Sequence, residues 1–332
     1  MAVFPTTGDF TTNPTYTGSF IPTLWSGKLL AKFYQNTMLS EIMNTDYEGE
    51  LKNKGDTIRI RTAPSITIND YSGAGSTLAT EVPVPITQDM QINKAKYFSV
   101  QTNDVLAQQA DMDLMNMFTE DAAKQLKIAI EDEVFFNAFV TNGPAAANAG
   151  ATAGAISQNY NLGTDAAPVA VSSSGNTGNL LNTILAMSAA LDEQNVPEDG
   201  RFLIISPFDR QILMQTNIAQ AYFTGDSSSI VRTGKIGMLD RFTVYVSNLL
   251  PKGAASKALV SGLTATSSGS AITAAARRTM VAGTKNACSF AMTISKTEPL
   301  RNQTDFGDIV RGLAVYGRKV VKDEALIVAK VL

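Results

Sequence analysis

The chain has 332 residues, of which 44% are hydrophobic and 17% charged, with a net charge of −3 and no histidine. A chain of this length buries a substantial core, which we expect to be divided between two lobes. The lack of histidine removes the commonest general base, the Ser-His and Cys-His dyads and most catalytic zinc sites. The slightly acidic balance argues against dedicated nucleic-acid binding, because such affinity rises with the number of phosphates neutralised.

The sequence predicts no membrane association and no secretion signal. No segment approaches the roughly 20 apolar residues that a membrane-spanning helix requires, and residues 1–10 lack a basic-then-apolar pattern. The single cysteine, Cys288, has no partner for an intrachain disulfide. We interpret it as a small buried apolar residue.

The first 45 residues read as an arm. Residues 1–20 hold six Thr and no Lys or Arg, which predicts an extended segment with little packing of its own. A short amphipathic helix ending before Asp46 is indicated by four apolar residues at helical spacing, Trp25, Leu29, Leu30 and Phe33. Trp25 is the only tryptophan of the chain, and we interpret it as the anchor of the arm and as a candidate contact between subunits; an ordinary core position fits equally well.

A long two-stranded loop is predicted next. After Gly55 the residues 58–61 alternate Ile with Arg, which indicates a strand with one basic face. Residues 86–102 alternate apolar and polar positions and predict one returning strand, while Pro and Gly are frequent between residues 63 and 85. An isolated two-stranded ribbon is only marginally stable in water, so we expect this one to need a partner surface.

Four basic residues are candidate contacts at the base of that loop, where pairing of its strands would gather them: Arg59, Arg61, Lys94 and Lys96. Opposite charges across an interface fix register more than they add affinity. We therefore consider a contact with an acidic partner surface, with ordinary solvated strand faces as the alternative.

One long helix is predicted over residues 111–142. Residues 86–142 contain neither Gly nor Pro, apolar residues recur at helical spacing, and Gly143-Pro144 is a stop signal. Asp111 or Asp113 is the expected N-cap. The run Glu131-Asp132-Glu133 is predicted to be a solvated face, because neighbouring acids on a helix point in different directions, with a divalent-cation site as the lesser alternative.

The remaining sequence indicates a mixed α/β lobe followed by strands. Residues 143–179 carry one charge and predict a long loop or loosely packed surface. The predicted elements after it are a helix over 180–196, a buried strand over 201–206, a helix over 207–215, and strands over 242–246, 287–294, 309–316 and 326–331. We expect the last strands to return and pack on the long helix.

Motifs for catalysis are not found. The glycines near Lys235 lack the spacing of a phosphate-binding loop, and there is no Gly-x-Ser-x-Gly elbow and no Cys or His metal spacing. We therefore predict no catalytic residues, no cofactor and no metal. The alternative from a different class is a histidine-free enzyme that uses Ser with Lys, or carboxylates, within residues 143–283.

The order of these parts resembles the major capsid protein of tailed double-stranded DNA bacteriophages, which has the Hong Kong 97-type fold. The resemblance extends from about Phe20 to Leu332 and rests on order rather than on one diagnostic motif. The stretches that carry it are Phe20-Ile21-Pro22 with Trp25, Lys54-Gly55-Asp56-Thr57-Ile58, residues 198–207, Gly234-Lys235-Ile236-Gly237, residues 242–248, and Ala314-Val315-Tyr316-Gly317.

This resemblance implies an α+β fold and a division into five parts. They are an N-terminal arm (1–45), an extended loop (46–100), the spine helix of a peripheral domain (101–142), an axial domain (143–299) and C-terminal strands of the peripheral domain (300–332). The implied function is a non-enzymatic shell subunit that forms pentamers and hexamers of an icosahedral capsid around the phage genome. A bacterial encapsulin compartment is the alternative on the same fold.

The resemblance also implies partners and a location. We expect a virion protein that is assembled in the host bacterial cytoplasm and encloses DNA without sequence-specific binding. Its expected partners are a portal and, as an optional partner, a decoration protein. A separate scaffolding protein is expected because the chain lacks a long charged helical N-terminal extension. Some family members join subunits by a Lys–Asn isopeptide bond, but residues 63–85 contain no Lys, so we expect non-covalent contacts.

Overall fold

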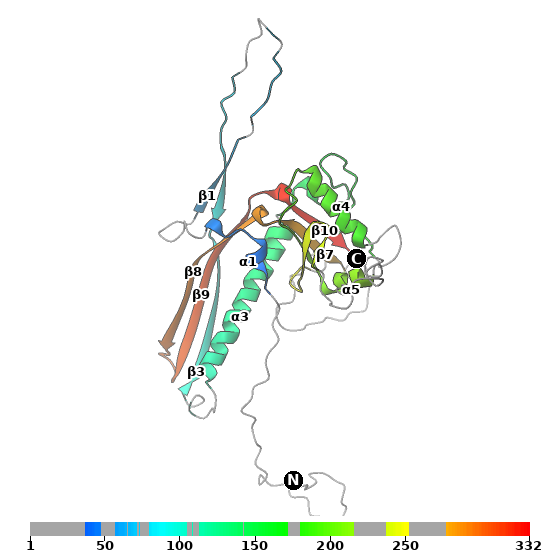
Figure 1. The fold of residues 1–332 in the computed structure, drawn as a ribbon. Helices are drawn as coiled ribbons and strands as arrows, with labels where there is room; N and C mark the ends of the chain where they lie inside the picture. Colours follow the sequence, from blue (N-terminus) through cyan, green and yellow to red (C-terminus); the bar gives the residue numbers. More distant parts are fainter. Residues whose placement is uncertain are drawn as a thin grey trace, which may run out of the picture.

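The computed structural model describes residues 37–47, 57–64, 66–71, 73, 80–104, 108, 113–141, 143–171, 180–215, 237–251 and 277–332. They form an extended loop, a three-stranded sheet with one long helix along it, and a five-stranded sheet with two further helices (Figure 1). This mixture confirms the predicted α+β class. Among the described residues no helix is long and apolar enough to cross a membrane.

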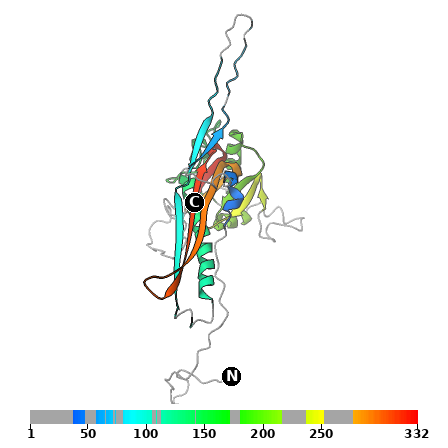
Figure 2. The same ribbon diagram turned by 90° about the vertical axis from the view of Figure 1, so that its left-hand side faces the viewer.

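The extended loop begins with β1 (Thr57–Thr62) and returns as β2 (Ile86–Gln91), and the two strands pair in antiparallel register. The predicted alternation in β1 is confirmed, because Ile58 and Ile60 are buried while Arg59 and Arg61 face solvent. The two isoleucines pack on Met90 and on Ala291 in the body of the protein. Beyond this base the loop projects away from both sheets (Figures 1 and 2).

The prediction of a single strand over residues 86–102 is wrong, because the chain breaks at Ile92 and Asn93. Its second half is β3 (Lys94–Asn103), which leaves β1 and pairs with β9 instead. The break lies directly against Gly317, where an added Cβ would come within 2.6 Å of the Gln91 carbonyl oxygen. This close approach permits the chain to pass from one sheet into the other.

The long helix is confirmed as α3 (Leu114–Val134), continued by a π-helical segment, η2 (Phe135–Thr141). Asp113 caps it, since its carboxylate accepts a hydrogen bond from the backbone N–H of Asn116 at 3.2 Å. Gly143 follows the end, at a position where a side chain would overlap carbonyl oxygens of the π-helical turn. We call α3 the spine helix.

The three-stranded sheet has the order β3-β9-β8 and lies along the spine helix (Figure 2). The strands β8 (Cys288–Arg301) and β9 (Gly307–Val320) form a long antiparallel hairpin. The buried residues of β9 alternate along the strand. At Gly312 the ring of its register partner Phe98 occupies the space that a side chain would need.

The five-stranded sheet has the order β10-β7-β4-β6-β5. Its strands are β4 (Arg201–Ile205), β5 (Met238–Leu239), β6 (Phe242–Val246), β7 (Arg278–Thr284) and β10 (Leu326–Val331). The predicted central strand is confirmed, because every residue of β4 is buried between β6 and β7. Only β4 and β6 run parallel among these pairs.

Two predicted helices accompany this sheet, α4 (Leu180–Glu193) and α5 (Pro207–Gln215). The amphipathic pattern of α4 is confirmed by four fully buried residues, Leu180, Ile184, Met187 and Leu191. The remaining helical pieces are short: α1 (Leu39–Ile42), η3 (Ala146–Asn148), η5 (Lys285–Ala287) and η6 (Asp323–Ala325).

The last strands return to the long helix, as predicted. β9 contacts the spine helix, and β10 contacts its π-helical continuation η2, while β10 also pairs with β7 as an outer strand of the five-stranded sheet. The long loop after the spine helix covers this edge rather than packing loosely. Its Asn148 amide donates to the Leu326 carbonyl at 3.1 Å, and Val169 N–H donates to the Lys330 carbonyl at 2.9 Å. An edge strand is thereby shielded from pairing with another chain.

Candidate functional site

The most exposed apolar surface of the described chain lies on the extended loop. Ile68 is 90% exposed and Val82 is 81% exposed, and three further large apolar residues are exposed there, Ile66, Tyr71 and Val84. The two sides of the loop are linked by a hydrogen bond from Thr67 N–H to the Glu81 carboxylate at 2.9 Å. Contiguous exposed apolar surface of this kind marks an interaction site.

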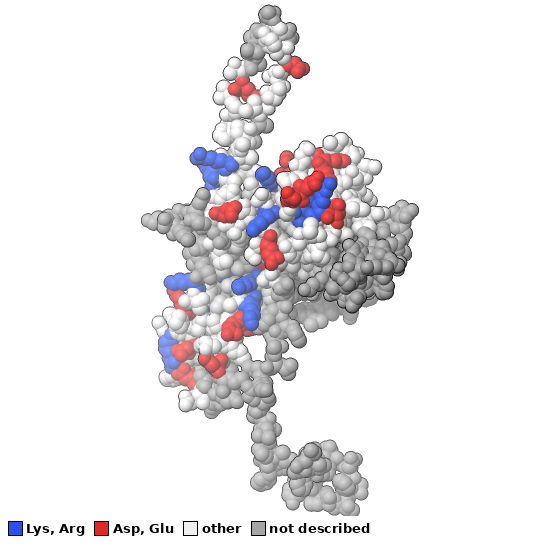
Figure 3. Space-filling model, viewed as in Figure 1, with Lys and Arg blue, Asp and Glu red and all other residues white. Residues whose placement is uncertain are grey.

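The charge on the loop is divided along its length. Basic side chains lie where the loop joins the body, and the described part farther out carries only acidic side chains, Asp70 and Glu81 (Figure 3). Arg59 at the base pairs with Asp89 of the facing strand at 2.9 Å, in a position where both side chains are largely exposed. Among the described residues no ion pair is found for Arg61.

The structure does not bring the four predicted basic residues into one strand pair. Arg59 and Arg61 lie on β1, whereas Lys94 and Lys96 lie on β3 in the three-stranded sheet, opposite Tyr316 and Ala314. Lys94 is exposed and its charge helps to lower the pKa of Glu133. The four residues lie on two different sheets because residues 86–102 form two strands rather than one.

The prediction that Glu131-Asp132-Glu133 forms a solvated face is wrong. The three residues are 1%, 6% and 8% exposed. They do point in different directions, but the end of the spine helix is enclosed on several sides at this level. Glu131 is buried against α1, and Glu133 is buried against β9. Where a helix is enclosed on several sides, its sequence has no single solvent-facing stripe that would indicate which residues are exposed.

Glu133 belongs to a network that joins the spine helix to β9. Its carboxylate accepts hydrogen bonds from Arg318 at 3.0 and 2.6 Å and from the Asn137 amide at 3.0 Å. The Tyr316 hydroxyl lies 3.4 Å from the same carboxylate. Burial alone would raise the pKa of Glu133, but Arg318, Asn137 and Lys94 together outweigh burial and the pKa is lowered.

Glu131 holds the start of α1. Its Oε2 accepts hydrogen bonds from the backbone N–H groups of Met38 at 2.9 Å and Leu39 at 3.3 Å. These are N–H groups that the first turn of a helix leaves without partners. Burial raises the pKa of Glu131 to about 7, against the opposing effect of the two N–H donors. Within the described part of the chain no ion pair is found for Glu131, whereas Glu133 is paired with Arg318.

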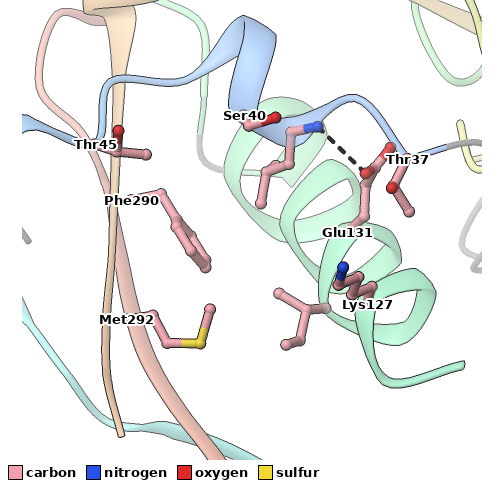
Figure 4. Close-up of a pocket in the computed structure, with 9 residues that line it drawn as sticks. Thr37, Ser40, Thr45, Lys127, Glu131, Phe290 and Met292 are labelled. Carbon is pink, nitrogen blue, oxygen red and sulfur yellow. Dashed lines mark hydrogen bonds between the residues drawn. The ribbon is translucent and has the colours of Figure 1, made fainter. Parts of the chain in front are cut away.

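A pocket of about 410 Å³ opens beside Glu131, between α1, the spine helix and β8 (Figure 4). Phe290 and Met292 point into it from β8 toward the helix, which contributes Lys127 and Glu131 (Figure 4). The other lining residues are Thr37, Leu39, Ser40, Thr45 and Ile130. Sequence reasoning missed this pocket, because its walls come from three segments that are far apart in the chain.

Cys288 and Trp25 were also singled out in the sequence, and the structure describes only the first of them. Cys288 is buried, as predicted, and burial raises the pKa of its thiol to about 12, so the nucleophilic thiolate is suppressed. Trp25 lies outside the described residues, as does the helix predicted around it. Among the described residues no group of three His, Cys, Asp or Glu side chains has the arrangement of a metal site.

Comparison with known proteins identifies the fold. The chain is similar to one from Mycobacterium phage Che8, with a TM-score of 0.68, 22% identity, and coverage of 93% of this chain and 96% of that one. It is also similar to the capsid of Cyanophage P-SCSP1u, with a TM-score of 0.67, 16% identity, and coverage of 95% and 93%. The mature capsid of bacteriophage PhiM1 gives a TM-score of 0.65 at 12% identity, with coverage of 99% of both chains.

These similarities confirm the Hong Kong 97-type capsid fold that the sequence resemblance implied. No curated protein matches the sequence. The sequence model described as phage capsid protein matches residues 84–329, which is most of the chain. The chain therefore belongs to the phage capsid protein family and is a structural subunit of a virion shell.

Proposed function

We propose that this subunit assembles into pentamers and hexamers that close into an icosahedral shell around the packaged double-stranded DNA genome. The observation that carries the proposal is the extended loop, whose apolar residues Ile68 and Val82 are almost fully exposed in the isolated subunit. A long ribbon with apolar side chains is stable only when another surface covers it. Identical copies of the chain supply such a surface in a closed assembly.

The loop is proposed to lie across the neighbouring subunit. The basic side chains where the loop joins the body are proposed to fix how the two subunits align. Arg59 and Arg61 face solvent on β1, and Lys94 and Lys96 lie farther along the chain on β3. Complementary charges at the rim of an interface guide association and exclude wrong alignments. An acidic patch on the neighbour is the expected partner for these side chains.

We infer that the chain has no catalytic role. Its thiol is buried with a raised pKa, and the carboxylate with the most strongly raised pKa, Glu131, holds backbone N–H groups of α1. Those contacts suit a structural role. A separate scaffolding protein and a portal, with a decoration protein as an optional partner, would act with the subunit during assembly in the host bacterial cytoplasm. The net charge of −3 supports a shell that encloses DNA without binding it strongly.

The direct test is to reverse the charge at the base of the loop. The double substitution Arg59→Glu with Arg61→Glu is expected to abolish shells in electron micrographs while the subunit keeps its far-ultraviolet circular dichroism. Substituting the exposed apolar pair, Ile68→Asn with Val82→Asn, is expected to have the same effect, because both side chains are almost free of contacts within the subunit.

A charge-swapped variant separates a local role from an intersubunit role. Arg59→Glu with Asp89→Arg keeps an ion pair between β1 and β2, because the two residues face each other at 2.9 Å. If Arg59 contacts a neighbour, this variant assembles poorly although its loop is intact. Normal shells from the Arg59→Glu and Arg61→Glu double mutant would contradict the proposed role of the loop.

A further inference from the structure

The pocket between α1, the spine helix and β8 has the features of a site that receives a side chain. Its volume of about 410 Å³ is within the range of roughly 300–1,000 Å³ that is usual for ligand sites. Phe290, Met292 and Ile130 supply an apolar wall, and Glu131 supplies a carboxylate beside it (Figure 4). The rest of the lining is partly polar, with Lys127 and the hydroxyl groups of Thr37, Ser40 and Thr45. An apolar wall beside a fixed polar group favours an occupant that has both characters.

The polar group in this pocket has unused hydrogen-bonding capacity. Glu131 is 1% exposed, and its Oε2 is taken by the N–H groups of Met38 and Leu39. Its other oxygen, Oε1, is buried and has no hydrogen-bond partner in the structure. A buried carboxylate oxygen without a donor costs free energy, so an occupant with an N–H or O–H group would be favoured here.

The neighbouring chain segment suggests what that occupant is. Thr37, the first described residue, lines the pocket, so the segment that precedes it starts at the pocket mouth. The twelve residue steps from Trp25 to Thr37 would span about 18 Å as a helix and at most about 43 Å when extended. Either length allows residue 25 to reach a pocket at residue 37.

We propose that the indole of Trp25 inserts into this pocket of its own subunit and donates its N–H to Oε1 of Glu131. Tryptophan combines a large apolar body with a single donor, and it usually finds a hydrogen-bond partner when buried. Met292 and Phe290 are suited to pack against the ring, since both sulfur–aromatic and aromatic–aromatic contacts are favourable. The carboxylate would then hold the arm at two points, at Trp25 and at the start of α1.

This anchor would fix the base of the arm and leave residues 1–24 to extend from a defined point. It acts within one subunit, so it does not depend on the proposed contact between the extended loop and a neighbour. Shell formation and indole burial can therefore be measured separately on the same sample. If the indole proves to be exposed, the proposed shell function still stands, and if no shells form, the proposed Trp25 anchor still stands.

The sole tryptophan makes intrinsic fluorescence an unambiguous probe of Trp25. Unassembled subunits and shells are separated by sedimentation, and acrylamide quenching of the emission is measured in each. We expect blue-shifted, quencher-protected emission in both fractions. A Thr45→Phe variant fills the pocket from its lining and is expected to return the emission to that of an exposed indole, whereas Thr45→Ser, the matched control, leaves it unchanged. Circular dichroism shows that each variant is folded.

A second measurement tests the contact with Glu131. The wild-type emission is expected to change as the pH is varied through the titration of this carboxylate, and Glu131→Gln is expected to abolish that change. Exposed indole in wild-type subunits, or protected indole in folded Thr45→Phe, would overturn the proposal. Protection that appears only in shells would also overturn it, because the occupant would then come from another subunit.

Discussion

Arg318 on β9 forms a two-pronged ion pair with Glu133 on the spine helix, with Nε and Nη2 at 3.0 and 2.6 Å from the two carboxylate oxygens. The side chains are 13% and 10% exposed, so the pair is shielded from solvent. It connects the spine helix to the central strand of the three-stranded sheet. The pair therefore ties the C-terminal end of the spine helix to the sheet.

Breaking this pair is expected to destabilise the subunit strongly. Arg318→Ala leaves Glu133 buried without its cation and should lower the free energy of unfolding by roughly 3–5 kcal/mol. Urea unfolding of unassembled subunits measures the change. The exposed pair between Lys296 and Glu298 supplies the control, since Lys296→Ala should cost less than about 1 kcal/mol. Equal effects of the two substitutions would contradict the structural role given to Arg318.

Glu131 predicts a pH dependence of stability. Burial raises its pKa from 4.5 to about 7, so the folded subunit binds a proton that the unfolded chain has released. Its contribution is therefore complete below about pH 4.5 and is lost as the pH rises through about 7, amounting to about 3 kcal/mol. Thermal unfolding of unassembled subunits between pH 5 and 8 measures this slope.

The variant Glu131→Gln should flatten that slope, because glutamine stays neutral while still accepting a hydrogen bond. Glu133 does not interfere in this window. Its pKa is lowered, so its stabilisation is present above its unfolded pKa and is lost only as the pH falls through the lower folded value. An unchanged slope in Glu131→Gln would show that another group controls the pH dependence.

Gly312 is expected to be intolerant of a side chain. An added Cβ would overlap the ring of Phe98, which lies across the strand pair from it. Gly312→Ala should therefore cost roughly 1–3 kcal/mol of folding free energy through overpacking. The matched control is Gly237→Ala, where the added Cβ has open space and the expected change is within about 0.5 kcal/mol. Comparable denaturation midpoints for the two variants would contradict the packing described at Phe98.

The shell is expected to lack covalent links between subunits. Residues 63–85 of the extended loop contain no Lys, so the amine for an isopeptide bond is missing from that segment. Shells that are boiled in detergent should release single chains of 35.4 kDa on a denaturing gel. A ladder of multiples of that mass would refute this prediction.

The elements that sequence alone predicts well are those with a strong local period. Alternation of Ile and Arg placed β1 with the correct faces, and helical spacing placed the spine helix and α4. The apolar run at Arg201–Ile205 gave the central strand of the five-stranded sheet. In each case one side of the element is buried, so apolar residues recur with the period of a helix or a strand. This pattern can be read from residues that are close together in the sequence.

The errors arise where packing between distant segments decides the outcome. The break at Ile92 and Asn93 contains no Gly or Pro that would predict it. The glycine that permits the break is Gly317, which lies on β9. The sheet that β10 joins was not predicted, because it depends on pairing with β7 and not on the sequence of β10 itself. Local patterns carry no information about either event.

In the candidate site, too, features set by local periodicity were predicted and features set by distant contacts were not. The exposed basic face of β1 was predicted from alternation, whereas the burial of Glu131 could not be. An acidic residue is almost never fully buried without partners, and here the partners are backbone N–H groups of α1, some 90 residues earlier in the chain. Only the folded structure brings the two segments together.

The central claim is that this chain builds a shell, and electron microscopy of the purified protein tests it most directly. The protein is expressed with its neighbouring genes and examined by sedimentation alongside the micrographs. The account predicts closed shells or tubes made of regular capsomers. A compact 35.4 kDa monomer under every condition would contradict it.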